Sequence, residues 1–130
     1  MDPLVAKSGK SFTPLPINVE QGFPQSFPLV FGGGTYHFKL YANVAAHLLA
    51  ARPQFIDVPA EEAFLVLSVE RELTDATREQ VFLRKIVPDL EYEVENIALL
   101  FSEKRIARDN LNGTGAHGTQ VVGGIARRWE

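Results

Sequence analysis

The chain contains no cysteine among its 130 residues. Disulfides, thiolate nucleophiles and zinc or iron–sulfur sites built on cysteine are therefore excluded. Its three histidines, His37, His47 and His117, form neither an HExxH nor an HxH pattern. A metal site would thus need carboxylates from distant segments, and we expect neither a metal nor any other cofactor.

The chain also lacks a block of basic residues, with 13 Lys and Arg against 16 Asp and Glu and a net charge of −3. Binding to nucleic acid without regard to sequence requires clustered cations, so we expect no nucleic-acid partner. The start, MDPLVAKSGK, has no apolar signal-peptide core, and no apolar run approaches the ~20 residues of a membrane-spanning helix. These absences predict an unprocessed, soluble protein with no membrane span.

The most clearly patterned stretch is a β-hairpin with strands at 27–31 and 35–44. In the second strand the apolar residues alternate with polar ones, and this period of two is typical of a strand with one buried face. The alternating apolar positions are Tyr36, Phe38, Leu40, Ala42 and Val44. Between the two strands lie Gly32, Gly33 and Gly34, which can adopt the positive φ angles that a tight hairpin turn requires.

Further strands are predicted at 63–73, 80–87 and 90–95, with a short extended piece at 55–58. The strands at 63–73 and 80–87 should pair as an antiparallel hairpin, and Pro88 with Asp89 forms a turn. The Ala/Leu-rich segment 45–52 favours a short helix, or a bent continuation of the preceding strand. Ser102 is a suitable N-cap for a second short helix over 103–110, and 97–101 continues the strand before it or opens this helix.

Both ends of the chain have the composition of extended arms. Residues 1–26 contain four prolines, which disfavour a helix or a central strand. Residues 112–130 contain five glycines and end near Trp129, a large apolar residue that we expect to be packed. The arms bury their apolar residues either on their own domain or on a neighbouring subunit. The candidate partner-binding residues are Phe12, Leu15, Ile17, Phe23, Val121, Val122, Ile125 and Trp129.

The predicted fold is therefore mainly β. It is a small antiparallel β-sandwich or barrel with one or two short helices and extended arms at both ends. The length and the 45% apolar content fit one core. We divide the chain into an N-terminal arm at 1–26, a β-rich core domain at 27–111 and a Gly-rich C-terminal arm at 112–130.

No motif in the chain predicts catalysis. The Gly triplet lacks the following Lys-Ser or Lys-Thr of a P-loop, and the GxGxxG match at 113–118 has no strand before it and no helix after it. Glu91, Glu93 and Glu95 should point the same way from one strand, so they repel one another instead of forming an acid/base pair. They form a solvated face, or one that meets the cations of a partner.

Part of the first hairpin resembles a known family. The residues are Gln25-Ser26-Phe27, then Gly32 to Gly34, then Tyr36-His37-Phe38-Lys39-Leu40-Tyr41, with Asn43 two residues on. This pattern is similar to the opening hairpin of the small plug proteins in the baseplates of contractile-tailed phages, and it ends at Val44. The resemblance implies a small β-rich virion component with other structural proteins as partners. It implies no active site.

From the arms and the resemblance, we expect a structural subunit of a phage tail, baseplate or related contractile injection assembly. It would be made in the bacterial cytoplasm, reside in the virion, and interlock neighbouring subunits through its arms. The alternative is a small cytosolic β-barrel enzyme or ligand-binding module. An enzyme should present a deep pocket with convergent polar groups, whereas an assembly protein should present long arms with little self-contact.

Overall fold

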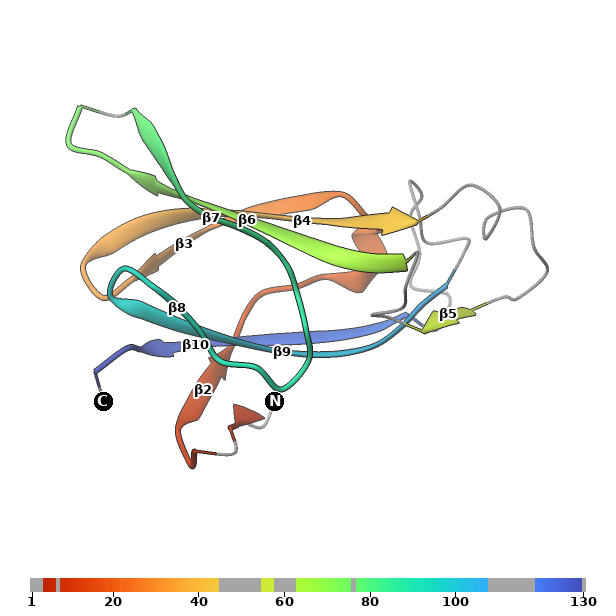
Figure 1. The fold of residues 1–130 in the computed structure, drawn as a ribbon. Helices are drawn as coiled ribbons and strands as arrows, with labels where there is room; N and C mark the ends of the chain where they lie inside the picture. The colour runs from red at the N-terminus through yellow and green to blue at the C-terminus, as the bar shows by residue number, and fades with distance from the viewer. Residues whose placement is uncertain are drawn as a thin grey trace.

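The computed structural model describes residues 4–6, 8–44, 55–57, 63–75, 77–107 and 119–129. Within them, ten strands form two antiparallel sheets, and the one helical element is the 3-10 turn η1 at Val19–Gln21. The two sheets lie one above the other in Figure 1. The predicted β-sandwich is therefore confirmed.

The first sheet has the strand order β3-β4-β6-β7. These strands are β3 (Gln25–Phe31), β4 (Gly34–Val44), β6 (Ala63–Glu72) and β7 (Arg78–Lys85). Both predicted hairpins are confirmed, since β3 pairs with β4 and β6 with β7. The first hairpin turns at Gly32 and Gly33, whose φ angles are 60° and 85°. These angles explain Gly32 and Gly33, because side chains are strained there.

The second sheet has the order β1-β2-β10-β9-β5, and β8 also pairs with β9. Its strands are β1 (Leu4–Val5), β2 (Ser11–Pro14), β5 (Phe55–Asp57), β8 (Tyr92–Val94), β9 (Ile97–Ala107) and β10 (Gln120–Arg127). The long pairing of β9 with β10 forms its centre. The sheet therefore unites segments from the beginning, the middle and the end of the chain.

The core lies between the sheets, where the apolar faces of both meet. From β4 and β6 come Phe38, Leu40, Leu65, Leu67 and Val69, and from β9 and β10 come Leu99, Phe101 and Ile125, all almost completely buried. The ring of Phe27 stacks on that of Phe38, with centroids 5.3 Å apart. Burying such side chains stabilises the fold by about 1.5–3 kcal/mol each, so the period-two alternation decides which face of each sheet turns inward.

The helix predicted at 103–110 is wrong where the structure describes it, because β9 continues as a strand to Ala107. Ile106 is fully buried there, so tertiary pairing overrides local helix propensity. The strand predicted at 90–95 is shorter, since β8 spans only Tyr92–Val94 and Leu90 is exposed. The possible helix at 45–52 and the GxGxxG match at 113–118 lie outside the described residues.

The described parts of both predicted arms pack on their own domain, which is one of the two alternatives that the sequence left open. Strand β2 pairs with β10, with Pro14 opposite Gly124, and Phe12 is fully buried. Pro14 stands at the end of β2, and Pro16 and Pro24 lie outside the strands, so the prolines limit the strand without preventing it. The described parts of both terminal segments therefore pair within the second sheet.

One glycine of the C-terminal segment, Gly123, serves close packing. Gly123 lies within β10, and a Cβ atom there would be 2.6 Å from Cε1 of Phe101 and 3.2 Å from Cδ1 of Ile17. Only glycine allows the strand to approach the Phe101 ring so closely. From the sequence, the five glycines predict an extended arm, whereas Gly123 is required because no side chain fits beside Phe101.

Gly123→Ala should lower the free energy of unfolding by about 1–3 kcal/mol, because Phe101 must leave its preferred position to admit a methyl group. Urea unfolding followed by circular dichroism measures the change. Gly34→Ala is the matched control, since a Cβ at that position would be 3.4 Å from Tyr36, an ordinary contact. Equal unfolding midpoints for the two variants would contradict the steric explanation.

Candidate functional site

Seven of the eight predicted partner-binding residues pack within this chain. Phe12, Leu15, Phe23, Val121 and Ile125 are buried, and Ile17 and Val122 are half-buried. Five of the seven pack in the core between the sheets, and Phe12 lies in a second buried cluster with Ala98 and Leu100. The eighth, Trp129, is 71% exposed, so the prediction that it is packed is wrong within this chain.

Trp129 lies two residues beyond the end of β10, and its neighbour Arg128 fixes the chain at this point. The Arg128 guanidinium lies over the indole ring, 5.1 Å from the ring centroid. Its Nη2 is 2.8 Å from Oε2 of Glu93, and its Nη1 donates a hydrogen bond of 3.3 Å to the carbonyl oxygen of Glu95. The cation that stacks on the tryptophan is therefore itself held by β8 and by the turn after it.

A second set of contacts holds the backbone beside Trp129. The Lys10 ammonium donates hydrogen bonds to the carbonyl oxygens of Arg127, at 3.1 Å, and of Arg128, at 2.8 Å. The backbone nitrogen of Arg128 donates a further bond of 2.9 Å to the carbonyl oxygen of Asn96. We call these contacts, together with those of the Arg128 side chain, the Trp129 clamp. The clamp presents a large apolar ring to solvent from a fixed position.

The three glutamates around β8 have separate partners within the chain. Glu91 accepts a hydrogen bond from the Ser8 hydroxyl, Glu93 pairs with Arg128, and Glu95 is 3.9 Å from Arg71. Glu95 has a φ of 53° and belongs to the turn after β8. The three glutamates therefore do not form the row of mutually repelling charges that the sequence predicts. The cations that face two of them, Arg71 and Arg128, come from this chain and not from a partner.

Two neighbouring hollows lie at the end of the sandwich where Trp129 is placed. One is lined by Gly32, Asn96, Arg127 and Trp129, and the other shares Gly32 and Asn96 and also contacts Tyr36 and Arg71. Figure 1 shows that the β3–β4 turn, the β8–β9 turn and the C-terminus meet at this end. The surface around the tryptophan is therefore concave and built from several turns.

Arg71 of β6 and Tyr36 of β4 lie opposite one another in the sheet, and both line the second hollow. The Arg71 side chain reaches Glu79 at 3.4 Å and Glu95 at 3.9 Å, and its Nε atom is buried with no hydrogen-bond partner among the described residues. Burial raises the pKa of the Tyr36 phenol. The Arg71 cation lowers this pKa and the Glu95 carboxylate raises it, both with smaller effects.

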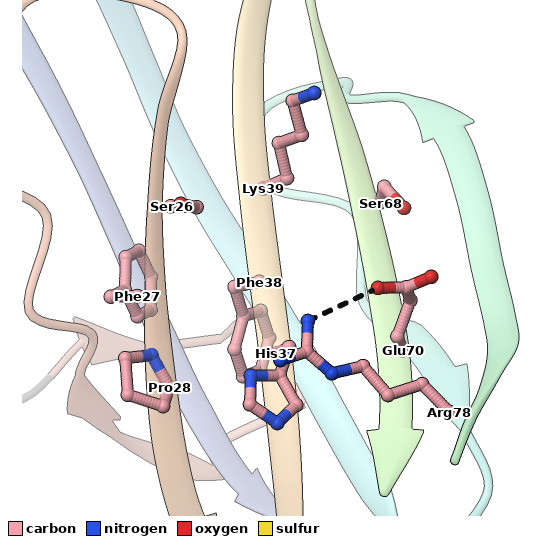
Figure 2. Close-up of a pocket in the computed structure, with 9 residues that line it drawn as sticks. All are labelled: Ser26, Phe27, Pro28, His37, Phe38, Lys39, Ser68, Glu70 and Arg78. Atoms are coloured by element: carbon pink, nitrogen blue, oxygen red, sulfur yellow. Dashed lines mark ion pairs between the residues drawn. The ribbon is translucent and has the colours of Figure 1, made fainter.

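The outer face of the four-stranded sheet is a different kind of surface (Figure 2). It contains an open hollow of about 480 Å³, whose lining includes Ser26, Pro28, His37, Lys39, Ser68, Glu70 and Arg78. Nε2 of His37 is 3.1 Å from Oε2 of Glu72, and Arg78 is 3.8 Å from Glu70. Exposed ion pairs of this kind contribute ~0–1 kcal/mol each.

The His37–Glu72 pair is the part of this face that most resembles catalytic machinery. A histidine held by a carboxylate activates a nucleophile only when its second nitrogen can reach a hydroxyl or thiol. The Ser68 hydroxyl on the same face accepts a hydrogen bond of 3.1 Å from Gln80, and among the described residues no hydrogen bond joins Ser68 to His37. The described residues contain no group of three or more His, Asp or Glu side chains that could hold a metal ion. His47 and His117 lie outside the described residues.

In the described part of the chain, no helix has the length and the apolar composition that crossing a membrane requires. Comparison with known proteins found no family model, no curated protein and no solved structure that matches this chain.

Tyr36 should ionise at higher pH than free tyrosine. A raised pKa in the folded state favours the neutral phenol, so its contribution to stability is present below about pH 10 and is lost as the pH rises further. Ultraviolet titration of the wild type and of Tyr36→Phe isolates the Tyr36 component by difference. If that component titrates at or below the pKa of free tyrosine, burial does not control it.

Loosening the Trp129 clamp should increase the motion of the indole ring. Trp129 is the only tryptophan, so intrinsic fluorescence reports on it alone. Lys10→Met removes the two hydrogen bonds to the carbonyl oxygens of Arg127 and Arg128, and we expect a lower fluorescence anisotropy with the fold intact. Arg84→Met, on the other sheet, is the control and should leave the anisotropy unchanged. An unchanged anisotropy in Lys10→Met would show that Lys10 does not hold the ring.

Proposed function

We propose that this protein is a non-catalytic structural subunit that binds other proteins in a multi-subunit assembly. The observation that carries the proposal is the exposed Trp129, held in place by the Trp129 clamp. Leaving a large aromatic ring in water has an unfavourable free energy, which a partner that covers the ring would recover.

The arrangement matches the physical requirements of a binding hot spot. Tryptophan and arginine are enriched among the residues that dominate protein–protein binding energies. Here the two stack, and Glu93, Lys10 and Asn96 hold their chain segment before any partner arrives. Because the side chains are already ordered, binding loses less conformational entropy. The neighbouring hollow beside Gly32 and Asn96 can receive a side chain of the partner.

We further propose that the assembly is a phage tail, baseplate or related contractile injection machine, and that the protein resides in the virion. This finer assignment is based on the resemblance of residues 25–44 to the opening hairpin of baseplate plug proteins. The buried arm residues no longer support interlocking by free arms. In our proposal Trp129 and its surroundings take over that role, with other structural proteins of the particle as partners.

Trp129→Ala should release the protein from the assembly without unfolding it. An epitope-tagged chain is expressed in its native source, and the extract is separated on a density gradient with identification of the co-migrating proteins. The wild type should sediment with a large particle made of structural proteins, and Trp129→Ala should remain in the light fractions. We expect a loss of at least about tenfold in the particle-bound fraction, as for an interface hot spot.

Val5→Ala is the matched control, because Val5 is another exposed apolar residue, at 63%, on a strand of the same sheet. It should sediment like the wild type. A wild-type chain found only in the light fractions, or a purified substrate-dependent activity that survives in Trp129→Ala, would contradict the proposed function.

A further inference from the structure

The outer face of the four-stranded sheet leaves apolar and charged side chains uncovered on the same side. Cross-strand pairing fixes this side, because residues opposite one another in a sheet project from the same face. Lys39 of β4 lies opposite Ser26 of β3 and Ser68 of β6, and Ser68 lies opposite Leu83 of β7. In the adjacent row, His37 lies opposite Pro28 and Glu70. Figure 2 shows Lys39 and Glu70 on this face, on neighbouring strands.

Two charged side chains of this face, Lys39 and Glu70, are open to a partner. Lys39 is exposed, and no described residue forms an ion pair with it. Glu70 is 3.8 Å from Arg78, and 42% of its side chain is exposed. The apolar Leu83 is 53% exposed, and Pro28 is exposed as well. A partner for this face should therefore present a carboxylate, an ammonium group and an apolar residue.

A second copy of the same face meets these requirements. The diagonal from Pro28 to Leu83 runs between Lys39 and Glu70, which lie on opposite sides of it. If a twofold axis follows this diagonal in the plane between two copies, each Lys39 lies opposite Glu70 of the other copy. Leu83 and Pro28, which are on the axis, then each meet their own counterparts. Such a contact is isologous and closes as a dimer.

We infer that the outer face of the four-stranded sheet is a self-association surface, with Lys39 of each copy paired to Glu70 of the other and Leu83 packed at the twofold axis. This dimer goes beyond the proposed function, because it uses a surface of the other sheet and names a second copy as the partner. Four strands and about four rows of side chains cover about 19 by 27 Å. Two such faces bury about 1,000 Å² in total, the lower limit of a specific interface.

The test is sedimentation equilibrium of the full-length purified protein over about 1–500 μM, the range in which small interfaces associate. The wild type should pass from monomer to dimer. Lys39→Glu and Glu70→Lys, each alone, should weaken dimerisation at least about tenfold, because like charges then face each other. An equimolar mixture of the two variants should dimerise again, since both contacts in the mixed pair are between Glu and Lys.

Arg84→Glu is the matched control for Lys39→Glu. The variant makes the same change of charge on β7. Arg84 lies opposite the inward-facing Leu67, so it does not project from the outer face, and the variant should dimerise like the wild type. Trp129→Ala should also dimerise normally, so failure of the dimer and failure of the proposed function give different results.

Three outcomes would overturn the inference. One is a wild type that stays monomeric across the concentration range. A second is a dimer that Lys39→Glu and Glu70→Lys leave unchanged, which would place the contact elsewhere. The third is a monomeric wild type whose particle binding is lost in Lys39→Glu, which would show that a different protein covers this face.

Discussion

The pairing of β10 with both β9 and β2 is the interaction on which the rest of the structure depends. It places the C-terminal strand inside a sheet, and β10 in turn gives β2 a partner. Gly123 makes the approach possible, because the ring of Phe101 occupies the space that a side chain would need. The same pairing determines where β10 ends, and thus where Arg128 and Trp129 leave the sheet. Core packing and the exposed tryptophan are therefore consequences of a single strand arrangement.

The sequence predicted those elements whose signals are local. Alternation around Phe38 and Leu67 and the glycines at 32 and 33 specify the two hairpins, because period and turn geometry act within a few residues. Prediction from the sequence failed where the structure depends on pairing between strands that lie far apart in the chain. Gly123 and Pro14 suggested flexible arms, yet each occupies a place in a sheet that only the partner strand defines. The residues after Ser102 have helix propensity, but pairing with β10 and β5 holds them as a strand.

The candidate sites show the same limit. A tryptophan near the end of a chain suggests a binding anchor, so Trp129 could be selected from sequence, although its exposure could not. Lys10 and Arg128 are 118 positions apart, and no local pattern relates them. On the outer face, alternation places His37 and Lys39 on one side of β4, but the β4–β6 register is needed to bring Glu70 beside Lys39. That register follows from the inward-facing apolar residues, since a shift by one would expose Leu67.

The edge strands of the four-stranded sheet also favour association through its face, because both disfavour pairing with a strand of another chain. An open edge strand can pair with another chain, and natural proteins block this with proline and charge. Pro28 lacks a backbone N–H and so removes one hydrogen-bond donor from the edge strand β3. The opposite edge strand, β7, carries the charged residues Arg78, Glu79, Arg84 and Lys85. Both edges of the four-stranded sheet therefore resist strand addition. The hollow on the outer face of this sheet and the hollow beside Trp129 have no lining residue in common, so one copy can bind through both at once.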